Sequence, residues 1–209
     1  MRSILVANAK GGCGKTTIAT TLAGAFAQVG LRVALADVDQ QHSSLGWLER
    51  RPAQMPRIEG IDWSKKIDAV RKKTQRLIID APAALTTDDF KLLLKQADLV
   101  IVPILPSAFD QHAASAFLKR VEAVKPIRNG KKPIAVVANR TRIHSRASRA
   151  LAEFLRALDH EPVISLPDTV LYTDAAETGL SIFDRRDGRA KVAQEMWLPL
   201  IDYAERAAA

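Results

Sequence analysis

The chain has 209 residues, 47% of them hydrophobic and 26% charged, a profile that fits one α/β domain over residues 1–209 rather than two domains with a linker. Its single cysteine excludes a disulfide framework and any metal site built from several thiolates of one chain. The formal charge of +8 favours an anionic partner. Because we find neither the apolar core of a signal peptide nor an 18-residue apolar stretch, we expect a cytoplasmic protein.

Short apolar runs alternate along the chain with helical patterns. We expect strands at residues 3–7, 32–38, 76–80, 99–104, 133–139 and 162–166. These runs are continuously apolar, which is typical of strands buried on both faces. The segment between the first two strands has helical spacing of its apolar residues Ile18, Leu22, Phe26 and Val29. The pattern predicts an α/β fold, a mostly parallel twisted sheet with helices on both faces, and ligands at the carboxyl ends of the strands.

The first loop at that edge reads NAKGGCGKTT, residues 8–17. Its glycines let backbone N–H groups turn inward, and the helix that follows adds the positive end of its dipole. Lys15 and Thr16 are the residue types that hold phosphates and Mg²⁺ at the end of a P-loop, although Ala9 replaces the usual first glycine. The predicted phosphate loop consists of Gly11, Gly12, Cys13, Gly14, Lys15, Thr16 and Thr17.

A second lysine, Lys10, precedes the glycine pair, and the loop thereby resembles the deviant Walker A motif of the ParA/MinD group of P-loop ATPases. Further stretches resemble that family in the same order along the chain. They are LADVDQQHSS with Asp37 and Asp39, RLIIDAP with Asp80, QADLVIVPILPS, VVANR with Asn139, and DAAETGLSIFD. The resemblance covers roughly residues 2–190. It is closest to the small single-domain ParA partition ATPases, since the loop begins at residue 8.

The resemblance implies a role for each matching residue. Lys15 and the loop backbone would hold the phosphates, with Thr17 near the α-phosphate, and Thr16 would ligate Mg²⁺. Lys10 would reach the nucleotide of a second subunit in an ATP-bound sandwich dimer, much as an arginine finger does in trans. Asp39 would position or activate the attacking water and, like Asp80, contact the metal through water.

Other residues have weaker assignments. Asn139 would hydrogen-bond the adenine, and the loop at Pro167 and Asp168 is a candidate for the other edge of the base. Asp37 has two interpretations, as support for the metal shell or as a carboxylate that caps the end of a strand. Cys13 occupies the variable position of the loop, where we expect its side chain to point away from the phosphates. A reactive, redox-active thiol at this helix start is the alternative.

Three basic clusters lie at residues 65–76, 140–149 and 185–191. Each alone fits a solvated surface, but together they predict an electrostatic nucleic-acid footprint. The candidates for DNA binding are Arg140, Arg142, Arg146, Arg149, Arg185, Arg186, Arg189 and Lys191.

The last segment carries an apolar stripe with net acidic charges beside it, which favours a helix packed on the sheet over the basic membrane helix of MinD-like proteins. The stripe consists of Val192, Met196, Leu200, Ile201 and Ala204. A membrane partner is therefore not expected. One cysteine also argues against nitrogenase-type iron proteins, and two tyrosines argue against bacterial tyrosine kinases.

The resemblance thus implies a partition or positioning ATPase with low basal turnover that uses ATP/ADP and Mg²⁺. ATP would drive dimerisation and nonspecific DNA binding, which places the protein on the nucleoid, and a small ParB-like, ParG-like or cargo adaptor would stimulate hydrolysis. The cargo stays open among a plasmid, a chromosome, a carboxysome and a chemotaxis cluster. Two alternatives remain: a MinD-like membrane-positioning ATPase, and an enzyme that transfers phosphate to a small molecule, as dethiobiotin synthetase does on a similar core. The second needs a substrate pocket, and no obvious insertion supplies one.

Overall fold

The computed structural model describes residues 1–207, and its strands form one seven-stranded sheet in the order β3-β2-β4-β1-β5-β6-β7. Every pair of neighbouring strands is parallel. The strands are β1 (Arg2–Val6), β2 (Val33–Asp37), β3 (Ile58–Asp62), β4 (Arg76–Asp80), β5 (Leu99–Ile104), β6 (Ile134–Thr141) and β7 (Ile164–Pro167). The predicted α/β fold with a parallel sheet is confirmed.

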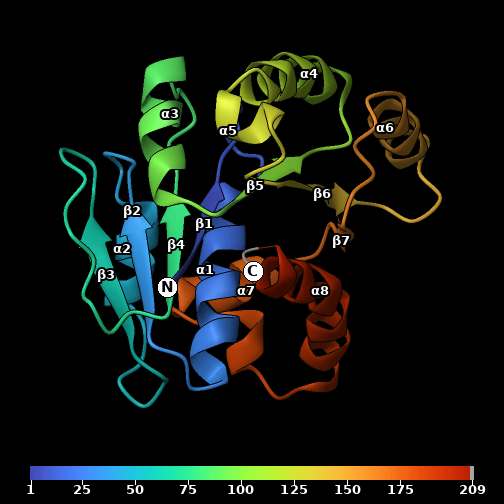
Figure 1. Ribbon diagram of the computed structural model, residues 1–209. Coiled ribbons are helices and arrows are strands. Elements are labelled where there is room, and N and C mark those ends of the chain that lie inside the picture. The colour runs from blue at the N-terminus through green and yellow to red at the C-terminus, as the bar shows by residue number, and fades with distance from the viewer. Residues whose placement is uncertain (208–209) are drawn as a thin grey trace.

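Helices cover both faces of this sheet (Figure 1). They are α1 (Lys15–Gln28), α2 (Ser43–Glu49), α3 (Thr87–Gln96), α4 (Ala108–Glu122), α5 (Lys125–Arg128), α6 (Arg146–Ala157), α7 (Leu171–Glu177), the 3₁₀ helix η1 (Ile182–Asp184) and α8 (Gly188–Arg206). One apolar core joins the sheet to α1, α2, η1 and α8, and it contains Trp47 and Trp197. The other joins the sheet to α3, α4 and α6, and it contains Phe90 and Phe117. Because both faces of the strands are buried, their sequences are continuously apolar.

Strand β3 is absent from the sequence prediction. Of its residues IEGID, only Ile58 is buried, and the other four are partly or fully exposed. It pairs with β2 alone and forms one edge of the sheet. Because Glu59, Gly60 and Asp62 interrupt its apolar residues, β3 lacks the apolar run that identifies the other six strands.

The C-terminal helix α8 packs on the sheet as predicted, but its buried face differs from the predicted stripe. The buried residues are Ala190, Ala193, Trp197, Leu200 and Ala204. Val192 and Met196 are instead 62% and 37% exposed. The sequence prediction followed the long apolar side chains of Val192 and Met196. It therefore missed Ala190 and Ala193, whose small side chains are buried in the core.

None of the helices in residues 1–207 is both long and apolar enough to cross a membrane.

Candidate functional site

The strand register brings the predicted site residues together at one edge of the sheet. Val6 lies opposite Asp80 of β4, and Asp80 lies opposite Asp37 of β2. The loop at residues 8–14 leaves the end of β1, so it emerges beside both carboxylates. This edge is where ligands bind in parallel α/β sheets.

The phosphate loop has the backbone that its glycines predict. Gly12 has φ of 73° and Gly14, just before α1, has φ of 97°, a conformation that side chains disfavour. A Cβ at Gly14 would also lie 2.2 Å from Nδ2 of Asn139. Curled backbone at the start of a buried helix provides the anion site that a P-loop requires.

The two lysines of the loop are placed differently. Lys15 is buried, and its ammonium group donates to the carbonyl of Lys10 at 3.0 Å. Lys10 is exposed, and in residues 1–207 its only hydrogen bonds involve its backbone. Lys15 is thus directed along the loop, whereas the side chain of Lys10 is free to reach outward.

Asn8 fixes the start of this loop, a role that the sequence prediction missed. It is buried, its Nδ2 donates to the carbonyl of Pro103 on β5, and its Oδ1 accepts from the backbone N–H of Lys10 at 3.2 Å. The side chain therefore connects β5 to the backbone from which Lys10 projects. Its position directly after the first strand was the available signal.

Asp80 lies buried at the end of β4. Burial raises the pKa of this carboxyl to about 7, the negative charge of Asp37 adds to the rise, and the hydroxyl of Thr16 and the ammonium of Lys15 oppose it. Its Oδ1 has no hydrogen-bond partner among the described residues. A buried oxygen without a partner beside Thr16 fits a hydrated cation. Within residues 1–207, the structure has no group of three or more His, Cys, Asp or Glu side chains that could hold a metal ion.

Asp37 caps the segment that follows β2. Its Oδ1 accepts from the N–H of Asp39 at 3.0 Å. Its Oδ2 accepts from the N–H and hydroxyl of Ser44 and from the N–H of Leu45, at 2.8 to 3.1 Å. Both oxygens are used, Oδ1 in the loop after β2 and Oδ2 at the start of α2, which favours the capping interpretation over support of a metal shell. Asp37 thereby holds the loop that carries the half-buried Asp39.

Asn139 and Cys13 meet at the phosphate loop. The Nδ2 of Asn139, near the end of β6, donates to the carbonyl of Cys13 at 2.8 Å, and its Oδ1 accepts from the N–H of Arg140. The Cys13 side chain is fully buried, its thiol donates to the carbonyl of Lys10, and burial raises the pKa of the thiol. A buried thiol with a raised pKa is inert, so the redox alternative is not favoured. The adenine contact of Asn139 stays a prediction.

The structure pairs two residues that the sequence assigned to different roles. Asp168, the candidate for the base, forms an ion pair with Arg142, a candidate for DNA, at 2.7 Å. Pro167 ends β7, one residue earlier. Whether Pro167 and Asp168 contact a base stays a prediction, but Asp168 fixes Arg142 at this edge.

Other basic candidates also have partners. Arg185 pairs with Asp187 at 2.9 Å. In the first cluster, Arg76 pairs with Glu205 of α8 and Arg71 pairs with Glu59. The exposed candidates that form no ion pair in the described chain are Arg140, Arg146, Arg149, Arg186, Arg189 and Lys191.

Asp110 is a further buried acid near the loop that the sequence prediction missed. It lies in the first turn of α4, where it accepts from the hydroxyl of Ser107, and its Oδ1 has no partner among the described residues. It lies close enough to the Cys13 thiol to raise the pKa of that group. The spacing of Ser107 and Asp110 was a readable helix-start signal.

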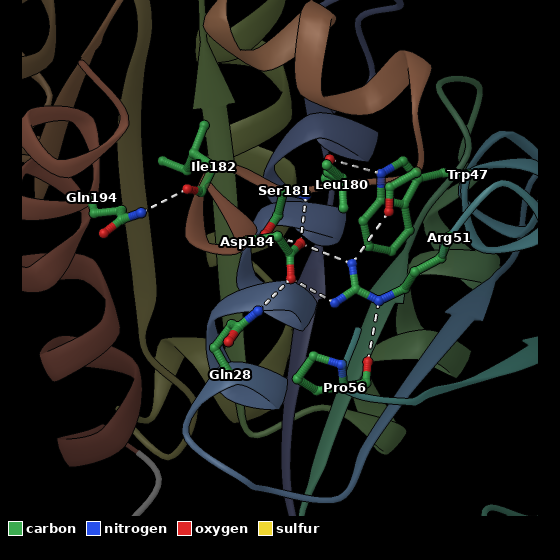
Figure 2. A network of polar contacts seen from close by, with 10 residues as sticks. Gln28, Trp47, Arg51, Pro56, Leu180, Ser181, Ile182, Asp184 and Gln194 are labelled. Atoms are coloured by element: carbon green, nitrogen blue, oxygen red, sulfur yellow. Dashed lines mark hydrogen bonds and ion pairs between the residues drawn. The ribbon is translucent and has the colours of Figure 1, made fainter. Parts of the chain in front are cut away.

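Figure 2 shows a polar network that joins the helices behind the site. Asp184 of η1 accepts from Arg51 at 2.8 Å, from Gln28 of α1 at 2.6 Å and from the N–H of Ser181 at 2.7 Å. The Arg51 and Asp184 side chains are 5% and 0% exposed. Trp47 of α2 donates to the carbonyl of Leu180. The network links α1, which begins in the phosphate loop, to the α2 region that follows Asp39.

A pocket of about 710 Å³ lies beside Asp39. The residues that line it include Gln40, Trp63, Pro82 and Leu93. The sequence showed no insertion for such a cavity, yet Trp63, which directly follows the unpredicted strand β3, lines it. The chain therefore has a cavity next to the predicted water-positioning acid.

The phosphate loop, the buried carboxylate at the end of β4 and the parallel sheet define a P-loop nucleotide-binding domain. A family model described as the CobQ/CobB/MinD/ParA nucleotide binding domain matches residues 4–182. A protein from Halothiobacillus neapolitanus named maintenance of carboxysome distribution protein A is 30% identical over 189 residues, which cover 87% of this chain and 86% of that protein. The chain therefore belongs to this family and is a ParA/MinD-type P-loop ATPase.

Solved structures confirm the fold. An ATP complex of McdA from Cyanothece has a TM-score of 0.76 at 16% identity, with 99% of this chain and 96% of that chain covered. A putative plasmid partition protein of Borrelia burgdorferi bound to AMPPNP has a TM-score of 0.74 at 17% identity, with 96% of this chain and 98% of that chain covered. Both of these similar chains were solved with a nucleotide.

Proposed function

We propose that this protein is a ParA-like positioning ATPase whose nucleotide state controls its assembly. ATP with Mg²⁺ binds the phosphate loop, two subunits close around their nucleotides, and the dimer holds DNA without sequence preference. Hydrolysis, slow alone and stimulated by a small adaptor protein, separates the subunits and releases the DNA. Of the four cargoes that the sequence leaves open, the name of the Halothiobacillus relative favours a carboxysome-like protein assembly.

The observation that supports this proposal most directly is the contrast between the two loop lysines. A buried Lys15 suffices to hold phosphates in the same subunit. Lys10 is exposed on a backbone held by Asn8 and Lys15, so its charge is directed out of the subunit. An exposed cation at the rim of a phosphate site can stabilise a nucleotide bound to a second subunit.

The test is the mass of the protein in solution with each nucleotide. We expect a dimer with ATP and Mg²⁺ under conditions that slow hydrolysis, and a monomer with ADP, as measured by light scattering on a sizing column. Lys15→Ala should stay monomeric in both because it loses nucleotide binding. A mass that does not change between ATP and ADP would contradict the proposal.

The pocket beside Asp39 supports the second candidate, transfer of phosphate to a small molecule. Its volume of about 710 Å³ is in the usual range for ligand sites, and it adjoins the acid that would align an acceptor. Product analysis separates the two functions. The positioning ATPase releases all of the γ-phosphate as inorganic phosphate, whereas a transferase releases less phosphate than ADP when a cell metabolite extract is added.

A further inference from the structure

A second pocket, away from the nucleotide edge, lies where α3, α4 and α5 meet on the far side of the sheet from α1 (Figure 1). Its volume is about 750 Å³. The floor is apolar, with Leu94 from α3 and Val124 and Pro126 at α5. Of the ten residues in the described chain that line it, five are basic and none is acidic. Nothing in the nucleotide site uses these residues.

The five basic side chains differ in whether another residue of the chain pairs with them. Lys91 pairs with Asp88 at 2.9 Å, and Lys132 donates to the carbonyls of Leu94 and Ala97 at the end of α3. Lys95 and Lys125 are exposed and form no hydrogen bond or ion pair among residues 1–207 through their side chains. Two unpaired ammonium groups therefore stand at the rim, on two different helices.

Arg120 supplies a third cation from within the pocket wall. Its guanidinium lies 5.3 Å from the centre of the Phe117 ring. Nε and Nη2 are buried and have no hydrogen-bond partner in the described chain. A buried charged donor without an acceptor costs free energy, and a carboxylate from a ligand would recover it. Arg120 is therefore a charged donor in the lining of the pocket that lacks partners for two of its nitrogens.

The combination of basic side chains and an apolar floor fits some anionic ligands better than others. A DNA duplex presents its phosphates on a convex, polar surface and has no group that would fill an apolar floor. A small anion would satisfy Arg120 but would leave Lys95 and Lys125 unpaired on separate helices. A peptide with several acidic side chains around an apolar one matches the floor, the buried guanidinium and the rim together.

We propose that the pocket between α3, α4 and α5 is a docking site for an acidic, partly apolar segment of a partner protein, with one carboxylate bound by Arg120. The site is separate from the nucleotide loop, so this proposal does not depend on the proposed function. It adds a protein-binding surface on the face opposite α1 and α8.

The test measures fluorescence anisotropy with the full chain and three labelled probes: a short peptide of Glu and Leu, its counterpart of Lys and Leu, and a DNA duplex. We expect saturable binding of the acidic peptide and not of the basic one. Arg120→Gln should weaken it about tenfold or more, the factor for losing a charge-assisted hydrogen bond. Arg156→Gln, at an exposed arginine of α6, should leave the affinity unchanged.

Several outcomes would overturn the proposal. They are no saturable binding of the acidic peptide, equal binding by wild type and Arg120→Gln, or a loss in Arg120→Gln of DNA binding alone. Thermal unfolding checks that the variant folds. If Arg120→Gln does not fold, the double variant K95E/K125E decides the question, because both lysines are exposed. It should weaken acidic-peptide binding, and unchanged binding would contradict the proposal.

Discussion

Lys10 is the residue whose environment bears most directly on the proposed mechanism. Its carbonyl accepts from Lys15 and from the Cys13 thiol, and its N–H donates to Asn8. The backbone is therefore fixed while the side chain is free. In an isolated subunit, such a lysine would contribute little to binding of that subunit's own nucleotide.

We predict that Lys10→Ala keeps the nucleotide affinity of the monomer but loses hydrolysis. A trans-acting charge on the transferred phosphate is worth on the order of 10³-fold in rate. Single-turnover kinetics under dimer-forming conditions measure the loss, and nucleotide titration of the monomer provides the control. A hydrolysis rate within a few fold of wild type would remove Lys10 from the catalytic role.

Asp39 is the second residue that we expect to act in the hydrolytic step. Its N–H is held by Asp37 and its Oδ1 accepts from Gln41, so the second oxygen can align a water molecule. We predict that Asp39→Ala binds ATP, dimerises and remains on DNA, because only the hydrolytic step is lost. Pull-down on DNA beads after ATP addition, with phosphate release measured in parallel, tests this. Rapid phosphate release by the variant would contradict the assignment.

At the scale of elements, the network in Figure 2 couples η1 to α1 and α2. Burial of both partners makes the Arg51–Asp184 pair sensitive to removal of one charge. We predict that Asp184→Asn lowers the free energy of unfolding by about 3 kcal/mol at neutral pH, since it leaves a buried guanidinium without its carboxylate. Chemical denaturation measures it, with Asp202→Asn on the exposed side of α8 as the control.

The same pair gives a pH dependence of known sign. The hydrogen bonds from Arg51, Ser181 and Gln28 outweigh the effect of burial and lower the pKa of Asp184. A carboxyl with a lowered folded-state pKa stabilises the fold fully above its ordinary pKa of about 4, and this contribution disappears as the pH falls through the folded value. The difference between wild type and Asp184→Asn should therefore shrink with acidification below about pH 4. A constant difference from pH 7 downward would contradict the assigned cause.

Sequence periodicity predicted the strands that are buried on both faces, because such strands have continuously apolar sequences. The six strands other than β3, and the helix after the phosphate loop, follow from apolar runs and spacing. Strand β3 did not, because Glu59, Gly60 and Asp62 interrupt its apolar residues, and the packed face of α8 did not, because the small residues Ala190 and Ala193 give a weak apolar signal. The loop residues have the types that phosphate binding requires, and their individual contacts with a nucleotide stay predictions. The capping bonds of Asp37 and the partners of Arg142 and Arg185 depend on long-range contacts that spacing alone cannot show.

Across the whole molecule, some basic side chains are paired with an acidic residue, and others are exposed and available to bind DNA. Arg185 pairs with Asp187, which caps α8 by accepting from the N–H of Ala190, whereas Arg186 and Arg189 are exposed. We predict that the double variant R186E/R189E abolishes retention on DNA in the ATP state and spares ATP binding, because it reverses two charges without touching the helix cap. Unchanged, salt-sensitive DNA binding would move the interface to another cluster, and R146E/R149E on α6 is the matched variant.

In the proposed function, ATP converts this protein into a form that holds DNA rather than membrane. The most direct measurement is co-sedimentation of the full chain with DNA-coated beads and with anionic liposomes, each in ATP and in ADP. The proposed function predicts that the protein sediments with DNA in ATP only, and with liposomes in neither nucleotide. Sedimentation with liposomes in ATP, or DNA binding that is equal in ATP and ADP, would contradict it.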